Sequence, residues 1–314
     1  MPGRKTKKSR FTFRGMMPVL PTPLDGRGCI DVKSLRRLVQ YCLKCGAVAI
    51  GQLGGASEFF KISDPERELI IETVVDEVGR CVPVFIGVAG ASERIAVCYA
   101  KQAQELGADM LMAAPPVGQR ASAEELREYY RAINEAVSIP IIIQDAGNAP
   151  GLTAEFMWRL YRDMDNIGYV KSEALDFLAK TAELIELSKG RMPVIGGAGG
   201  KHMIHMLRLG VTAFMTGTEA LDLHDAVVHA HLRGDEEKAA RIYFEKLLPY
   251  LMFYSDHYRE LLKQMLHRRG VIDSPEQLLP RETTPLTKAE QREFDWILKR
   301  VGLADLRFPE VGKF

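Results

Sequence analysis

The sequence contains little cysteine, almost no net charge and no long apolar run. Its five cysteines, an odd number in 314 residues, argue against a disulfide framework and for a reducing compartment. The formal net charge of +1 gives no field strong enough to attract nucleic acid or an acidic membrane. The longest apolar stretches, around residues 82–91 and 139–143, are too short to span a bilayer. We therefore expect a soluble cytoplasmic protein without a nucleic-acid or membrane partner.

Residues 1–14 form a basic segment that differs from the rest of the chain. Its basic side chains are Arg4, Lys5, Lys7, Lys8, Arg10 and Arg14. No apolar h-region follows them, so the segment does not read as a secretory signal. We interpret it as a solvated, disordered tail, with a localisation signal or a nucleic-acid arm as the alternative.

The cysteine and histidine pairs do not have the context of a metal site. Cys42 and Cys45 form a C-x-x-C, but no second pair of ligand spacing accompanies them, which favours core thiols on one helix face. The histidine pairs lack an H-E-x-x-H context or a carboxylate at ligand spacing. We therefore predict helix residues rather than zinc ligands at His202, His205, His229 and His231.

Short apolar runs alternate with helix-period segments along most of the chain. Near-continuous runs of Val, Ile and Met are typical of strands buried on both faces. They occur at residues 16–20, 48–53, 82–88, 110–114, 139–145, 167–171, 193–196 and 213–216. This alternation fits a closed barrel or a doubly wound open sheet. An open sheet is expected to have G-x-G-x-x-G after its first strand, where this chain has Pro21-Thr-Pro-Leu-Asp-Gly. We predict an α/β fold, a (β/α)8 TIM barrel.

Beyond residue 220 the strand pattern ends. Helix-period segments follow at residues 221–233, 236–254, 257–269 and 288–301. We predict that the barrel occupies residues 15–233. Residues 234–314 are then a C-terminal helical extension packed on the same body.

Polar residues at the carboxyl ends of the predicted strands are the candidate site residues, because the βα loops of a barrel converge there. The second strand is followed by Ser57 and Glu58, and the fifth ends in Gln144 and Asp145. The seventh leads into a glycine loop at residues 196–200. Such a loop can bind a phosphate or a carboxylate through backbone N–H groups. Because Lys201 is the only adjacent basic residue, a carboxylate is favoured.

Lys171 ends the apolar run of residues 167–170, a position that removes water from its amine. Burial disfavours the charged form of an amine, and the neutral amine is the form that attacks a ketone to give an imine. The alternative is a structural lysine that pairs with Glu173 or Asp145. Position alone leaves these two interpretations equally open.

Several segments share a pattern that goes beyond the alternation of strands and helices. They are Pro18-Val-Leu-Pro-Thr-Pro-Leu, Ser57-Glu-Phe-Phe-Lys-Ile-Ser-Asp-Pro-Glu-Arg, Gly107-Ala-Asp-Met-Leu-Met-Ala-Ala-Pro-Pro, Tyr169-Val-Lys171-Ser-Glu173 and Lys263-Gln-Met-Leu-His-Arg-Arg-Gly-Val-Ile. Together they resemble the dihydrodipicolinate synthase / N-acetylneuraminate lyase family of class I aldolases and dehydratases. The resemblance implies that Lys171 forms the Schiff base, that no metal or organic cofactor is needed, and that the protein is a homotetramer or homodimer.

Two departures from the family pattern concern the reaction itself. Synthases and sialate lyases of the family carry a pair of hydroxyl residues where this chain has Gly55 and Ala56. They also carry a tyrosine at the end of the fifth strand, where this chain has Gln144, and an amide cannot replace a phenol in proton transfer. The pattern is similar to the branch that includes 2-keto-3-deoxy-L-arabonate dehydratase. Glu173 is then the acid/base candidate. It lies two residues after Lys171, and residues i and i+2 of a strand share a face.

The resemblance implies a lyase that dehydrates a 2-keto-3-deoxy sugar acid to an α-ketoglutarate semialdehyde-type product. Lys171 and Glu173 are the predicted catalytic residues. The predicted substrate-binding residues are Ala56, Ser57, Glu58, Gln144, Asp145 and Gly197. Among these, Ser57 and Gly197 are expected to hold the carboxylate and Gln144 to orient the sugar hydroxyls. The alternatives are a pyruvate-dependent aldolase or synthase that uses the same imine, and a ligand-binding protein that has lost turnover.

Overall fold

Eight parallel strands form the centre of the molecule. The computed structural model describes residues 11–118, 120–145 and 151–304. The strands are β1 (Gly15–Met16), β2 (Ile50–Gln52), β3 (Val84–Gly87), β4 (Met110–Ala113), β5 (Ile141–Asp145), β6 (Ile167–Ser172), β7 (Val194–Gly196) and β8 (Ala213–Phe214). They follow one another in the order β1-β8-β7-β6-β5-β4-β3-β2. The ring closes between β1 and β2, where the Val48 N–H donates to the Met16 carbonyl at 2.8 Å and the Leu20 N–H donates to the Gly51 carbonyl at 2.8 Å.

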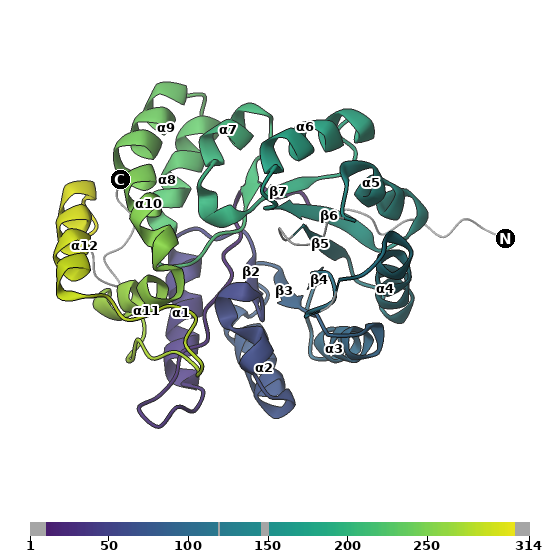
Figure 1. Cartoon of the computed structure of the whole chain (residues 1–314), viewed down its shortest axis with the longest axis horizontal. Coiled ribbons are helices and arrows are strands. Elements are labelled where there is room, and N and C mark those ends of the chain that lie inside the picture. Colours follow the sequence, from purple (N-terminus) through teal and green to yellow (C-terminus); the bar gives the residue numbers. More distant parts are fainter. Residues whose placement is uncertain (1–10, 119, 146–150, 305–314) are drawn as a thin grey trace.

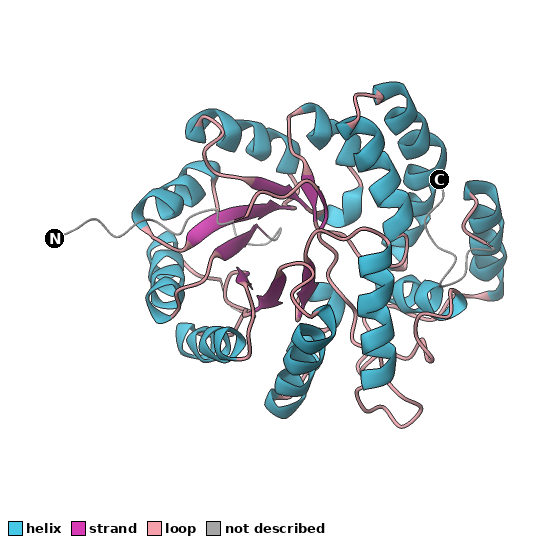
Figure 2. Cartoon of the chain, turned by 180° about the vertical axis from the view of Figure 1, so that it is seen from behind, coloured by secondary structure: helices cyan, strands magenta, loops and turns pink. Residues whose placement is uncertain are grey.

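Helices surround the strands (Figures 1 and 2). The outer ring consists of α1 (Val32–Lys44), α2 (Asp64–Val78), α3 (Glu93–Glu105), α4 (Ala123–Ala136), α5 (Ala154–Asp163), α6 (Phe177–Ser188), α7 (Met203–Arg208) and α8 (Leu221–Leu232). Strands that are covered in this way are buried on both faces, which explains their continuous apolar sequences. The predicted (β/α)8 barrel is confirmed.

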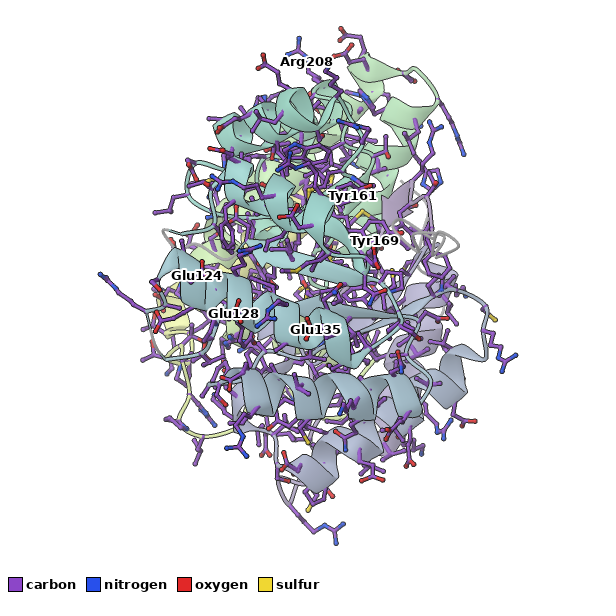
Figure 3. All side chains as sticks on the ribbon, turned by 90° about the vertical axis from the view of Figure 1, so that its right-hand side faces the viewer. Glu124, Glu128, Glu135, Tyr161, Tyr169 and Arg208 are labelled. Carbon is purple, nitrogen blue, oxygen red and sulfur yellow. The ribbon has the colours of Figure 1, made fainter. Side chains whose placement is uncertain are left out.

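The barrel helices begin with the capping residues that their sequences predict, and they have one exposed polar face and one buried apolar face. Ser63 and Glu66 form a capping box at the start of α2, and Ser122 and Glu125 form one at α4. Each box satisfies two N–H groups that the first helical turn leaves without partners. Figure 3 shows one surface of α4, labelled at its solvent-exposed residues Glu124, Glu128 and Glu135. Its other face buries apolar and tyrosine side chains against the barrel.

The C-terminal helices lie beside α8 and α1, on one side of the barrel (Figure 1). They are α9 (Glu236–Ile242), a π-helical turn (Tyr243–Leu247), α10 (Leu248–Asp256), α11 (Tyr258–Arg268) and α12 (Lys288–Val301). The segment predicted as one helix over residues 236–254 is thus an α-helix interrupted by one π turn. The Arg37 side chain of α1 donates to the Val271 carbonyl at 2.6 Å, which joins the segment after α11 to the first barrel helix.

The basic N-terminal segment is shorter than predicted. Residues 1–10 lie outside the described residues, but residues 11–14 pack against the barrel. The Tyr169 hydroxyl donates to the Phe11 carbonyl at 2.7 Å and accepts from the Phe11 N–H at 2.9 Å. Phe13 is 9% exposed and its ring centroid lies 5.7 Å from that of Tyr169. The prediction of a tail that extends to residue 14 is therefore wrong at its end, since two aromatic side chains anchor this part. No helix in the described ranges has both the length and the apolar character needed to cross a membrane.

Candidate active site

A cavity of about 360 Å³ opens at the carboxyl ends of the strands. Strand ends, the loops after them and the helices α10 and α11 contribute its walls. The lining residues that matter below are Gly55, Ala56, Gln144, Lys171, Glu173 and Ala198, together with Lys201, Thr216, Gly217, Tyr254, Ser255 and Tyr258. The cavity is therefore where the barrel architecture leads one to expect chemistry, and both predicted catalytic residues line it.

Lys171 and Glu173 form an ion pair inside this cavity. The Lys171 Nζ lies 2.8 Å from the Glu173 Oε2, and Lys171 is only 8% exposed. Both residues line the cavity, as their spacing of two residues predicts.

Strand alternation also separates Gln144 from Asp145. Gln144 lines the cavity and its Nε2 donates to the Glu173 Oε1 at 2.6 Å. Asp145 points the other way, toward α6, where its Oδ2 lies 3.2 Å from the Lys180 Nζ. Gln144 holds Glu173 in place, a role that the sequence did not predict. Asp145 is not among the lining residues, so its predicted substrate contact has no support in this geometry.

The charge of Glu173 is fixed by its neighbours. Burial raises the pKa of this carboxyl, but the Lys171 ammonium, the Gln144 amide and the Ala198 N–H together outweigh burial and leave it below 4.5. The Ala198 N–H donates to the Glu173 Oε2 at 3.4 Å. Glu173 is consequently an anion at neutral pH, the form required of a base.

Ala56, Ser57 and Glu58 follow β2 and were all predicted to contact substrate, but their side chains lie in different surroundings. Ala56 lines the cavity within a 3₁₀ turn, Gly55–Ser57, and the first N–H groups of such a turn have no partner inside it. The Ser57 hydroxyl instead donates to the Leu20 carbonyl at 2.5 Å and is fully buried. Glu58 lies between Lys61, at 2.9 Å, and Lys263, at 3.1 Å. Ser57 and Glu58 therefore support the loop, while Ala56 faces the cavity.

Gly197 packs against the Glu173 side chain and does not line the cavity. A Cβ atom on Gly197 would lie 2.7 Å from the Glu173 Cβ and 2.9 Å from its Oε2. Only hydrogen fits in this space, so the glycine allows the carboxylate to stand against the loop after β7. Gly197, in the glycine loop of residues 196–200, is therefore required by the close approach of Glu173 and not by a bound anion.

Gly197→Ala is expected to displace Glu173 from Lys171 and lower kcat about 10- to 100-fold, because small misplacements of catalytic groups have effects of this size. Steady-state kinetics on the reaction proposed below would measure the loss. Gly26→Ala is the control, since no atom lies within 4 Å of its added Cβ. Equal kcat values for the two variants would contradict the role given to Gly197.

Several lining residues were not predicted from the sequence. Thr216 follows the short strand β8, and Lys201 follows the glycine loop. Tyr254 and Tyr258 come from α10 and α11. These two residues belong to separate helices, and the sequence pattern of these helices does not show which strand ends they cover. In the described part of the chain, no group of three or more His, Cys, Asp or Glu side chains could hold a metal ion.

Comparison with known proteins places this geometry in a family. Residues 12–301 match the dihydrodipicolinate synthetase family. The chain belongs to this family. Among curated relatives, L-2-keto-3-deoxyarabonate dehydratase of Azospirillum brasilense is 31% identical over 296 residues, which cover 91% of this chain and 94% of that protein. The 4-hydroxy-tetrahydrodipicolinate synthase of Pelodictyon phaeoclathratiforme is also 31% identical, over 92% of this chain and 97% of its own length.

Solved structures of the dihydrodipicolinate synthetase family share the fold. YagE from E. coli K12, determined in complex with pyruvate, superimposes with a TM-score of 0.85 at 25% identity, over 93% of this chain and 100% of its own. Dihydrodipicolinate synthase from Acinetobacter baumannii, also complexed with pyruvate, gives a TM-score of 0.84 at 25% identity, over 93% of this chain and 100% of its own. The chain is a Schiff-base lyase of this family, and Lys171 is its buried cavity lysine.

Proposed function

We propose that this protein dehydrates a 2-keto-3-deoxy sugar acid of the arabonate type. The observation that carries the proposal is the Lys171–Glu173 pair, 2.8 Å apart, in a cavity where Gln144 replaces a proton-transferring phenol. The similarity to the Azospirillum dehydratase over 91% of the chain supports the same reaction. A cavity of about 360 Å³ falls in the range of sites for small ligands.

The proposed reaction begins at Lys171. Its amine attacks the C2 ketone, water leaves, and the resulting iminium ion withdraws electrons from C3. Glu173 takes the C3 proton to give an enamine. The enamine electrons then form a double bond between C3 and C4 while the C4 hydroxyl leaves. Loss of a C5 proton and protonation at C3 convert this unsaturated iminium ion into the enol of the semialdehyde. Hydrolysis of the imine and conversion of the enol into the aldehyde release the product. The electron sink is the imine, so each step uses groups present in the cavity.

The geometry assigns separate tasks to the neighbours of this pair. The Ala56 N–H, at the first turn of Gly55–Ser57, is proposed to hold the substrate carboxylate. Gln144 fixes Glu173 through the 2.6 Å hydrogen bond and keeps its carbonyl oxygen available for a substrate hydroxyl. Since Glu173 is charged at neutral pH, it receives a proton without first losing one.

Aldol cleavage or condensation is the second candidate, favoured by the synthase that is 31% identical over 92% of the chain. Both reactions share the imine and diverge afterwards. An aldolase breaks the C3–C4 bond and releases pyruvate, while a dehydratase breaks C3–H and C4–O and keeps the carbon chain intact.

Incubation with a panel of 2-keto-3-deoxy acids, followed by borohydride reduction, tests the proposal. We expect a reduced adduct on the peptide that contains Lys171, and a semialdehyde product of unbroken carbon chain. Release of pyruvate would show the aldolase reaction instead. An adduct without any product from the whole panel would show a ligand-binding protein.

A further inference from the structure

A second pair of proton-carrying side chains lies at the cavity wall formed by the end of β8 and by α10. Gly217 and Tyr254 line this wall. Behind them stands Glu219, which is 1% exposed and takes no part in the steps described above. Burying a carboxyl group costs free energy, so its position beside the cavity suggests a function.

The space around Gly217 shows how close these groups are. A Cβ atom on Gly217 would lie 2.2 Å from the Glu219 Oε2 and 3.1 Å from the Tyr254 hydroxyl. The carboxyl and the hydroxyl therefore meet on one side of a residue that has no side chain, directly at the wall. Tyr254 is only 4% exposed, yet it lines the cavity. Tyr254 thus lines the cavity next to Glu219, which does not line it.

Neither oxygen has another hydrogen-bonding partner within the described ranges. The Glu219 Oε2 and the Tyr254 hydroxyl lack a bond of regular geometry, although the hydroxyl still acts on the carboxyl and lowers its pKa. Contacts of this kind are often long in a free enzyme and tighten when the substrate binds. Two buried polar atoms without other partners are costly to maintain for structure alone.

Burial gives Glu219 a protonation state unlike that of Glu173. It raises the pKa of Glu219 to about 7, against lowering contributions from its own backbone N–H, Tyr254 and Arg269, while Asp222 adds to the rise. The titratable and charged groups that face this carboxyl come from α1, α8, α10, α11 and the residue after α11: Cys42, Asp222, Tyr250, Tyr254, Tyr258 and Arg269. Glu219 therefore keeps its proton until the pH rises through about 7, whereas Glu173 is already ionised below that pH.

We propose that Glu219 and Tyr254 form the proton-donating pair for the leaving C4 hydroxyl group, an inference that rests on the dehydration proposed above. As the C4–O bond breaks, its electron pair stays on oxygen. That oxygen takes the Tyr254 proton and leaves as water, and Tyr254 takes the proton of Glu219. The C3 proton on Glu173 returns to solvent with product release, and Glu219 regains one from solvent through Tyr254. The cycle thus releases one water molecule from C4 and no net proton.

Two assays on the full-length protein separate this role from imine chemistry. Exchange of pyruvate methyl protons with deuterium requires Lys171 and Glu173 alone, whereas dehydration also requires the donor. In Tyr254→Phe and Glu219→Gln we expect pyruvate exchange within about 2-fold of wild type and dehydration lowered about 100-fold, as for loss of a general acid. Tyr250→Phe is the control, because Tyr250 stacks on Tyr254 at 5.4 Å and is fully buried but does not line the cavity.

The pH dependence supplies a signature that a structural role would not give. A donor must be protonated, so wild-type kcat for dehydration is expected to fall as the pH rises through about 7, and Glu219→Gln should lack this limb. Equal losses of exchange and dehydration, or unchanged dehydration in both variants, would overturn the inference alone. A wild-type protein that exchanges pyruvate protons but dehydrates no 2-keto-3-deoxy acid would overturn the proposed function and this inference with it.

Discussion

Lys171→Met is expected to abolish both the borohydride-reducible adduct and the dehydration of 2-keto-3-deoxy acids. Enzymes accelerate reactions by about 10⁶-fold or more, and here the imine on Lys171 supplies the electron sink on which the acceleration depends. Methionine keeps the length and the apolar stem of lysine, so the change removes the amine with little change in packing. Mass spectrometry after reduction measures the adduct, and product formation measures turnover.

The second lysine of the cavity provides the matched control for this experiment. Lys201 also lines the cavity, but its amine is not part of the Lys171–Glu173 pair. Lys201→Met should therefore keep the reduced adduct at Lys171. An adduct of equal yield in Lys171→Met would show that another amine is the nucleophile.

Glu173→Gln distinguishes the base from the nucleophile. Its amide still accepts a hydrogen bond from Gln144 but takes no proton, so the adduct should persist while dehydration falls by about 10²- to 10⁴-fold. The lowered pKa of Glu173 sets the pH range as well. A base must be deprotonated, so wild-type activity should be lost on the acid side only as the pH falls through a value below the ordinary 4.5 of Glu.

Much of the fold and the catalytic pair could be predicted from the sequence because local rules determine them. Apolar runs without alternation predict doubly covered strands, and a period of two predicts that Lys171 and Glu173 share a face. The same period, applied to Gln144 and Asp145, separates the residue that faces the cavity from the one that faces α6. Both were predicted to bind substrate because their position at a strand end was considered without the face of the strand on which each side chain lies.

Long-range packing explains what could not be predicted. Tyr254 and Tyr258 reach the cavity from helices that lie outside the regular barrel, and no spacing within those helices specifies which strand ends they cover. Glu58 was predicted to contact substrate because it follows β2. It instead forms an ion pair with Lys263, which lies 205 positions further along the chain. Contacts between such distant segments depend on the assembled fold.

Lys263→Met is expected to lower the free energy of unfolding by about 3–5 kcal/mol, the usual effect of removing one partner of a buried ion pair. Lys263 and Glu58 are each 2% exposed at the side chain, with Nζ and Oε2 3.1 Å apart. Burial lowers the pKa of Lys263, while Lys263 and Lys61 outweigh burial and lower that of Glu58. The carboxylate therefore stays charged in the folded protein, and loss of Lys263 leaves it with one ammonium neighbour.

Urea unfolding measures this effect, with a shift in midpoint and an unchanged slope. Glu58→Gln combined with Lys263→Met should recover most of the loss, because replacing both partners of a buried pair is often near neutral. Arg159→Met removes an exposed ion pair, with Arg159 and Glu155 56% and 63% exposed, and should change stability by less than about 1 kcal/mol. A loss in Lys263→Met no larger than in this control would contradict the role of the pair.

The same pair connects stability to the active site. Glu58 directly follows the turn Gly55–Ser57, whose first two residues line the cavity, and Arg259 of α11 donates to the Gly55 carbonyl. The extension thus contacts the turn that is proposed to bind the substrate carboxylate. Through α10 it also contributes Tyr254, which is proposed to donate a proton. Lys263→Met should for this reason raise KM for the 2-keto-3-deoxy acid even at temperatures where the variant is fully folded. A variant of lower stability with an unchanged KM would restrict the extension to a structural role at this turn.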